Sequence, residues 1–157
     1  MGSLLVRNLF FTILQPGIVV VLIPYFILGD KVNTIFTEPF GIQQVMSAII
    51  FFIGFLIMTT CILRFAFYGR GTLSPADPTK QLITVGLYKY SRNPMYIGVL
   101  LMLIGLSVLF GSNSLGMYTM FVFISFNIFI VFFEEPRLRK DFGEDYMNYC
   151  KRVRRWI

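Results

Sequence analysis

The chain has 157 residues, of which 56% are apolar and only 14% are charged, and its mean hydropathy is +0.72. Soluble domains carry about 25% charged residues, so this composition excludes an ordinary soluble protein and predicts an integral membrane protein. The length suits one domain and leaves no room for a separate soluble catalytic module. We therefore expect any functional site to be built from loops, helix ends and the C-terminal tail.

Four apolar segments are long enough, or nearly so, to cross a hydrocarbon core, which needs about 20 apolar residues. They are Leu9–Leu28, Val45–Phe67, Met95–Phe110 and Leu115–Phe133. The first is too long, and has too little charge before it, for a cleaved signal peptide, so we expect a membrane anchor that is kinked at Pro16 and Pro24. Only the turn Gly111–Ser114 separates the last two, which predicts a tight antiparallel hairpin.

The predicted fold is all-α, with about four transmembrane helices and a C-terminal amphipathic helix at the membrane surface. The single membrane domain divides into residues 1–68, which hold the first two spans, and residues 69–157, which hold a loop, the helical hairpin and the tail. Small side chains allow helices to approach closely in lipid. We expect four of them to pack the hairpin: Gly98, Gly105, Ser107 and Gly116.

Lysine and arginine are concentrated on one side of these spans. They are Arg64, Arg70, Lys80, Lys89 and Arg92 between the second and third spans, and Arg137, Arg139, Lys140, Lys151, Arg152, Arg154 and Arg155 in the tail. The positive-inside rule then places both termini and these polar segments in the cytoplasm. Anionic lipid headgroups explain the net charge of +6, so no nucleic-acid partner is needed. Two cysteines and no histidine argue against a disulfide framework or a zinc site, and we expect no metal.

The tail after Pro136 has the pattern of an amphipathic helix. Its apolar or aromatic residues recur every three or four positions, at Leu138, Phe142, Tyr146, Tyr149 and Val153. Gly143 should weaken this helix or break it in two, and Trp156 is a candidate interfacial anchor. We expect the helix to lie along the interface or to fold over the mouth of the hairpin. A plain basic surface helix would explain the composition equally well.

Two polar clusters stand where apolar runs meet water. Glu134 and Glu135 close the fourth span, and the segment Tyr88–Tyr96 opens the third. Two helices joined by a short turn would bring these clusters together at one membrane face. Ionisable groups at a membrane boundary are costly without partners, so they are candidates for a site. The alternative is structural: Glu135 pairs with Arg137, Arg139 or a loop lysine, Glu134 is a helix-end charge, Arg92 is a positive-inside anchor, and the tyrosines only pack.

Several motifs follow one another in a fixed order. They are Gly69-x-Gly71-Thr72, then Gly86-x-Tyr88-x-x-x-Arg92-Asn93-Pro94-x-Tyr96-x-Gly98, then Glu134-Glu135-Pro136, and finally Tyr146-x-x-Tyr149. In this order they resemble the integral membrane methyltransferases, a superfamily that includes the isoprenylcysteine carboxyl methyltransferases and the phospholipid N-methyltransferases. The resemblance covers roughly Gly69 to Trp156 and implies S-adenosylmethionine as the cofactor. In the carboxyl methyltransferases a histidine stands at the position of Asn93, whereas Asn-Pro is the pattern of the phospholipid branch.

The resemblance and the chemistry of the side chains give the same site. Gly69 and Gly71 match the Gly-x-Gly associated with the cofactor, the two glutamates can accept hydrogen bonds from ribose or ammonium groups, and Arg92 can clamp a carboxylate. Aromatic rings can line an adenine pocket or face a sulfonium. Asn93 can hydrogen-bond but cannot act as a base. We therefore expect catalytic roles for Glu134 and Arg92, and cofactor binding by Gly69, Gly71, Tyr88, Asn93, Pro94, Tyr96, Glu134, Glu135, Tyr146 and Tyr149.

The expected reaction is direct in-line methyl transfer to a hydrophobic or lipid-like acceptor at the interface between membrane and cytosol. Alignment and the exclusion of water would supply most of the acceleration. An amine, phenol or thiol acceptor must lose a proton, and Glu134 or a tyrosine is the plausible base. Fold-level similarity does not identify the acceptor. A prenylated cysteine, a phospholipid amine, another lipid and a small carboxylate stay open, as does the oligomeric state.

Two other classes of protein fit part of the sequence. A nicotinamide-dependent membrane reductase of the sterol-reductase type would use the basic loop and tail to bind its cofactor phosphates, but the adjacent glutamates would repel those phosphates. A non-enzymatic membrane subunit would explain the spans and the basic tail. It would leave the ordered polar clusters without a cause.

Overall fold

The computed structural model describes residues 16–34, 41–68 and 82–157, and these residues form helices and no strands. The elements are η1 (Ile18–Leu22), α2 (Ile23–Leu28), α3 (Lys31–Thr34), α4 (Ile42–Tyr68), η2 (Gly86–Lys89), α5 (Pro94–Leu109), α6 (Asn113–Phe129), η3 (Ile130–Glu134) and α7 (Glu135–Arg152). η1 and η3 are π-helices and η2 is a 3₁₀ turn. The all-α prediction is thus confirmed for this part of the chain.

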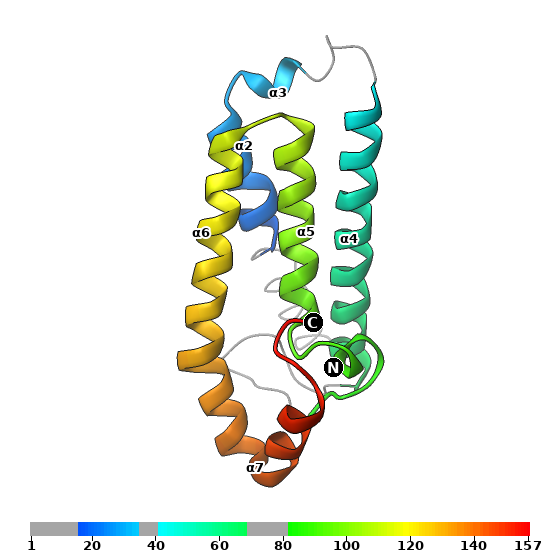
Figure 1. The fold of residues 1–157 in the computed structure, drawn as a ribbon, viewed down its shortest axis with the longest axis vertical. Helices are drawn as coiled ribbons and strands as arrows, with labels where there is room; N and C mark the ends of the chain where they lie inside the picture. Colours follow the sequence, from blue (N-terminus) through cyan, green and yellow to red (C-terminus); the bar gives the residue numbers. More distant parts are fainter. Residues whose placement is uncertain (1–15, 35–40, 69–81) are drawn as a thin grey trace, which may run out of the picture.

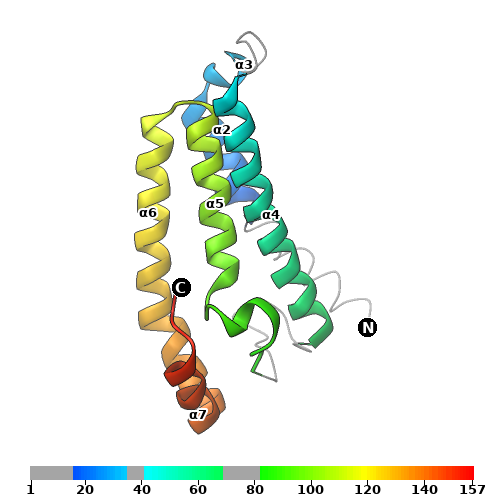
Figure 2. The same ribbon diagram turned by 45° about the vertical axis from the view of Figure 1, so that its right-hand side comes forward.

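Helices α4, α5 and α6 run side by side along the long axis of the molecule, with α5 between the other two (Figures 1 and 2). α2 packs on the same bundle, and α7 lies at the end opposite α3 (Figure 1). The short turn between α5 and α6 makes them the expected antiparallel hairpin. The main apolar core lies between these helices and consists of Val20, Met58, Val99, Met102, Leu103 and Val122.

The closest helix contact is between α4 and α5, and it depends on glycine. A Cβ atom on Gly54 would lie 2.5 Å from the carbonyl oxygen of Gly98, and one on Gly98 would lie 2.8 Å from the carbonyl oxygen of Gly54. A Cβ on Gly105 would lie 2.9 Å from backbone atoms of α4. The expectation that Gly98 and Gly105 pack the α5–α6 hairpin is therefore wrong, because both face α4. Gly116 does face the hairpin, where its Cβ would lie 3.4 Å from Ser107 Oγ.

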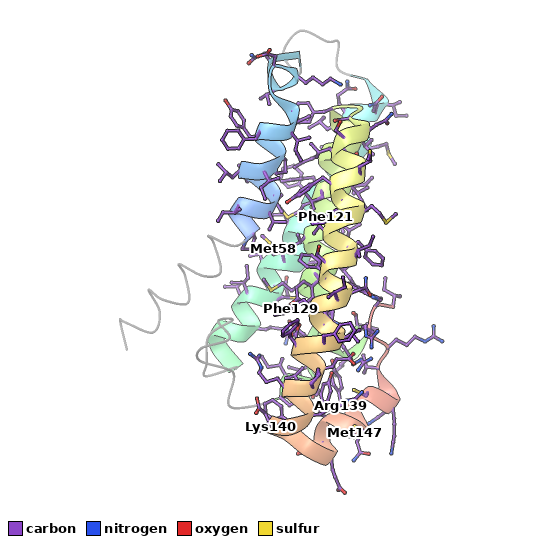
Figure 3. The ribbon with its side chains drawn as sticks, turned by 90° about the vertical axis from the view of Figure 1, so that its left-hand side faces the viewer. Met58, Phe121, Phe129, Arg139, Lys140 and Met147 are labelled. Carbon is purple, nitrogen blue, oxygen red and sulfur yellow. The ribbon has the colours of Figure 1, made fainter. Side chains whose placement is uncertain are left out.

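Within the described residues, two helices are long and apolar enough to cross a membrane: Ile42–Arg64, which is most of α4, and the continuous helix that begins at Asn113. Their outward faces carry exposed apolar rings, among them Phe52, Phe121 and Phe132. Figure 3 shows Phe121 and Phe129 projecting along the length of α6. An exposed apolar face on a long helix suits lipid and not water. Helix α5 has 16 residues, about 24 Å of rise, and is shorter than a full span.

The segment before α2 shows how a proline is accommodated within an apolar helix. In η1 the N–H of Ile23 bonds to the carbonyl of Ile18, which is the π-helical register. In that register the next carbonyl, that of Val19, would face Pro24, which has no N–H. The hydroxyl of Tyr118 on α6 donates to the Val19 carbonyl at 3.1 Å instead. A π-helical turn therefore precedes Pro24, a neighbouring helix satisfies the freed carbonyl, and the kink expected at Pro24 stays a prediction. Pro16 lies at the first described residue, and the span before it lies outside the described residues.

Helix α7 is amphipathic and bends at Gly143, as the sequence predicted. Gly143 has φ +50°, a conformation that favours glycine, and it divides α7 into two parts. The inward residues Tyr146, Tyr149 and Val153 form a buried cluster, against which Leu82, Leu138 and Phe142 pack. The second half of α7 is thereby held against the segment that precedes α5. The predicted position of this helix along the membrane interface or over the mouth of the hairpin stays a prediction.

We predict that Gly98→Ala destabilises the protein by about 1–3 kcal/mol, because the added methyl group overlaps the α4 backbone and the two helices must separate. Gly116→Ala is the matched control, since its nearest contact is the movable hydroxyl of Ser107. The temperature at which half of the detergent-solubilised protein loses its monodisperse elution peak should fall for the first variant and stay close to wild type for the second. Equal temperatures for both variants would contradict the α4–α5 contact.

Candidate functional site

The two polar clusters meet at one end of the bundle. The hydroxyl of Tyr96, in the first turn of α5, donates to Glu134 Oε2 at 2.9 Å. Arg92, just before α5, places its Nη1 atom 3.3 Å from Glu135 Oε1. The predicted juxtaposition of the Arg-Asn-Pro corner with the adjacent glutamates is therefore present, and both clusters lie on the side of the bundle that carries α7 (Figure 1).

The local backbone explains why these groups reach one another. Pro94 starts α5, where its missing N–H costs nothing, and Asn93 precedes it with a non-helical conformation that turns the chain into the helix. Across the hairpin, Glu134 ends the π-helix η3 and Glu135 starts α7. π-helical turns often occur at functional sites. Here the two consecutive glutamates contact different elements, with Glu134 against α5 and Glu135 against the C-terminal tail.

Glu135 is the most heavily partnered charge of the site. Its side chain is only 8% exposed, and Arg155 binds it through two hydrogen bonds, Nε to Oε1 at 2.9 Å and Nη2 to Oε2 at 3.1 Å. Arg92 adds a second guanidinium at 3.3 Å. The hydrogen bond to Glu135 raises the pKa of Arg155. The sequence alternative of pairing with Arg139 is present only as a longer contact of 3.9 Å to an exposed side chain, so the principal partners are Arg155 and Arg92.

Glu134 follows directly after the apolar stretch that ends at Phe133, and it lies in a different environment. Burial raises the pKa of its carboxyl group, while the hydrogen bond from Tyr96 and the charge of Arg137 act in the opposite direction. Among the described residues Tyr96 is the one side chain that donates a hydrogen bond to it. A carboxylate with this spare acceptor capacity can bind a cation or an N–H or O–H donor, and a raised pKa suits it to take up a proton.

Donor groups in the site also remain available. The Nε atoms of Arg92 and Arg137 are buried and have no hydrogen-bond partner within the described part of the chain. Buried polar groups are normally paired, so unpaired donors at a candidate site require an explanation. Two unpaired guanidinium N–H groups beside a carboxylate fit a ligand that carries both an anionic group and a cationic group. S-Adenosylmethionine has a carboxylate, an ammonium and a sulfonium, so these residues fit it.

The corner before α5 is tied to the C-terminal tail, Val153–Ile157. The side-chain amide of Asn93 donates to the carbonyl of Arg155 at 3.0 Å, and the hydroxyl of Ser91 donates to the same oxygen at 3.2 Å. The backbone N–H of Arg92 bonds to the carbonyl of Arg154 at 3.0 Å. Asn93 and Pro94 are buried. Because the side-chain amide of Asn93 already donates to the tail, a direct role of Asn93 in cofactor binding stays a prediction.

The four tyrosines of the prediction separate into two groups. Tyr96 reaches Glu134, as described above. Tyr149 donates from its hydroxyl to the carbonyl of Tyr88 at 2.7 Å, and burial raises the pKa of Tyr149 to about 12. The ring of Tyr146 lies 6.3 Å from that of Tyr149. Tyr88, Tyr146 and Tyr149 thus hold η2 against α7, and a contact between any of them and the cofactor stays a prediction.

A hollow of about 550 Å³ opens beside Tyr149, between α7 and the segment that precedes α5. Its lining residues are Leu82, Thr84, Lys89, Asp145, Tyr149, Arg152 and Val153. Lys89, Asp145 and Arg152 form no ion pair with any residue that the structure describes. The hollow therefore offers two cations and one acid to a polar ligand at the cytoplasmic end of the predicted topology.

The profile of the phospholipid methyltransferase family matches residues 42–145, from the start of α4 into α7. This match covers more than half of the chain. The chain belongs to the phospholipid methyltransferase family. Members of this family are integral membrane enzymes that transfer methyl groups from S-adenosylmethionine to lipids. A search of curated proteins gave no match.

Membership decides between the classes that the sequence left open. The enzyme prediction and the cofactor prediction are confirmed, and the reductase and non-enzymatic alternatives are set aside. The matched region begins at Ile42 and includes the second predicted span, whereas the motifs noted in the sequence begin only at Gly69. The Gly-x-Gly residues Gly69 and Gly71 lie outside the described residues, so their predicted cofactor contact stays a prediction.

Two contacts of this site have no local signal in the sequence that identifies both partners. Arg155 is one of many positive charges in the tail, and spacing does not predict its pairing with Glu135 because 20 positions separate them. Trp156 donates from its Nε1 to Asn127 Oδ1 within α6 at 3.1 Å, a contact that the sequence analysis does not anticipate, and its role as an interfacial anchor stays a prediction. An asparagine inside an apolar span was the available signal, because such a residue needs a hydrogen-bond partner.

We predict that Glu135→Gln lowers the free energy of unfolding by about 2–3 kcal/mol, because it removes the charge that compensates Arg92 and Arg155. Breaking a fully buried pair costs roughly 3–5 kcal/mol, and the partial exposure of Arg155 reduces that figure. Glu134→Gln should cost much less, since amide and phenol can still hydrogen-bond. Thermal unfolding of both variants without cofactor measures the difference. If Glu134→Gln were the less stable of the two variants, Glu134 and not Glu135 would be the carboxylate that stabilises the fold.

Proposed function

We propose that this protein transfers a methyl group from S-adenosylmethionine to the amine of a phospholipid headgroup at the cytoplasmic face of the membrane, with Glu134 and Tyr96 in the reaction site. The observation that carries this proposal is the hydrogen bond between Tyr96 and Glu134 at the boundary of the apolar helices. A carboxylate of raised pKa at the end of the apolar helices supports the proposal, because a lipid headgroup and a water-soluble cofactor would meet at such a boundary. Family membership supports a lipid acceptor.

The cofactor, when bound, would supply an electrophilic methyl group: the acceptor nitrogen would take the methyl carbon, the C–S electron pair would stay with sulfur in S-adenosylhomocysteine, and the amine would release one proton. The carboxylate of Glu134, when ionised, would attract cationic groups and could accept that proton directly or through water. The hydroxyl of Tyr96 fixes the orientation of the carboxylate. Packing of Tyr96 against Phe126, with ring centroids 4.6 Å apart, keeps water from this side.

The remaining groups bind and orient. The unpaired Nε groups of Arg92 and Arg137 can donate to a carboxylate or phosphate, which sets the position of a ligand in front of Glu134. The hollow beside Tyr149 presents Lys89, Arg152 and Asp145, which suit an anion and an ammonium a few bonds apart. Holding two reactants in place in this way can account for roughly 7–11 kcal/mol of a barrier, so little covalent chemistry is asked of the protein.

We predict that S-adenosylmethionine or S-adenosylhomocysteine raises the thermal stability of the detergent-solubilised protein and that reduced nicotinamide nucleotides do not. Glu134→Gln should remove most of this stabilisation while membrane insertion stays normal, because the carboxylate is proposed to contact the cofactor. Lys140→Gln is the matched control, since Lys140 is exposed on α7. A Glu134 variant that binds the cofactor with wild-type affinity would move the binding site elsewhere.

The proposed orientation places α7 and the site in the cytoplasm, with four spans and both termini on that side. Cysteine introduced at Lys140 should therefore react with a membrane-impermeant maleimide only after cells are opened, and cysteine at Asn113, at the other end of α6, should react in intact cells. Both positions are exposed. The unchanged protein, with Cys61 and Cys150, gives the background. Labelling of position 140 from outside would invert the topology.

A further inference from the structure

The C-terminal tail does not end as a free extension of α7. At Val153 the backbone leaves the helix with φ −125° and ψ 129°, an extended conformation. The chain then returns toward the start of α5, where its end lies in Figures 1 and 2. The tail therefore runs between the corner that precedes α5 and the end of α6, which are the two elements that bring Tyr96 and Glu134 together.

On the α5 side the tail is bound by backbone and side-chain donors. Two of its carbonyls, those of Arg154 and Arg155, accept three hydrogen bonds from the Ser91–Asn93 corner, at 3.0–3.2 Å. The two side chains of the corner that donate these bonds, Ser91 and Asn93, are buried. Because three hydrogen bonds join adjacent residues of the corner to the tail, the tail holds the corner in one position.

On the other side, two side chains of the tail bind the continuous helix formed by α6, η3 and α7. The guanidinium of Arg155 donates two hydrogen bonds to Glu135. Trp156 Nε1 donates to Asn127 Oδ1, and the ring of Trp156 lies 5.3 Å from that of Phe123. Asn127 is seven residues before Glu134, about 10 Å further along the helix. The tail thus reaches past the glutamates into the apolar part of the bundle.

We propose that this tail is part of the methyl-transfer site and that Arg155 is its positioning residue, which sets the place of Glu134 relative to Tyr96 by holding the adjacent Glu135. The inference rests on the proposed function. Arg155 joins both sides at once, because its carbonyl accepts from Asn93 and Ser91 while its guanidinium binds Glu135. A shift of about 1 Å at a reacting group can cost about 100-fold in rate. Loss of the Arg155 contact should therefore lower turnover more than it weakens cofactor binding.

The kinetic test uses Arg155→Gln and Arg155→Lys in the full-length protein, with Arg154→Gln as the control, because the exposed Arg154 contributes only its backbone to these contacts. With vesicles of phosphatidylethanolamine and saturating S-adenosylmethionine, we expect kcat of Arg155→Gln to fall at least about tenfold, with the dissociation constant of S-adenosylhomocysteine changed less than about threefold. Arg155→Lys should recover part of the loss, and Arg154→Gln should equal wild type. Wild-type kcat in Arg155→Gln, or equal losses in turnover, affinity and thermal stability, would overturn the proposal.

A second readout does not depend on activity. Trp156 is the only tryptophan of the chain, so its fluorescence reports directly on the tail. In wild type and Arg154→Gln, lipids brominated on their acyl chains should quench this emission, and aqueous acrylamide should quench it weakly. Release of the tail in Arg155→Gln should weaken quenching by the brominated lipids and strengthen quenching by acrylamide. Unchanged quenching in that variant would refute the positioning role. A wild-type protein that methylated no phospholipid would count against the proposed function alone, and the quenching test would still apply.

Discussion

The buried carboxylate of Glu135 is the constraint on which this end of the molecule depends. Removing a carboxylate from water costs several kcal/mol, so it must be compensated by opposite charge and hydrogen bonds. The chain supplies two guanidiniums from different places, Arg92 before α5 and Arg155 in the tail, both within 3.3 Å. Because loss of either guanidinium would leave the buried carboxylate less well compensated, the start of α5, the start of α7 and the tail are held as one unit.

The position of that unit is set by packing farther along the bundle. Helix α5 is short, and its glycines let its backbone touch that of α4 near Gly54. Such contacts have no adjustable side chain between the two backbones, so the α4–α5 distance is fixed. The position of α5 determines where the corner with Arg92 and Asn93 lies. The turn between α5 and α6 then limits where Glu134 can lie on the other arm of the hairpin. The match to the family profile includes α4, in agreement with this dependence.

The sequence was sufficient to predict helices α4, α5, α6 and α7 and the meeting of the two polar clusters. Apolar run length, the short turn after α5, Gly143 and the tyrosine spacing in α7 are local signals, and each has a local physical cause. Contacts between distant residues were not accessible in this way. Gly98 and Gly105 could have faced either neighbouring helix, and only the three-dimensional arrangement shows that they face α4. Arg155 had no distinguishing pattern among the basic residues, and its selection for Glu135 depends on the return of the chain after Val153.

The adjacency of the two glutamates has an electrostatic consequence for the site. Two neighbouring carboxylates repel, and the charge of Glu135 does raise the pKa of Glu134. Glu135 itself is paired with two guanidiniums, whereas Glu134 has the hydrogen bond from Tyr96 and the charge of Arg137 to offset its burial. One carboxylate is thus held in ion pairs, and the other keeps acceptor capacity at a membrane boundary, where burial favours its protonated form. A sulfonium or ammonium brought beside Glu134 would favour the ionised carboxylate.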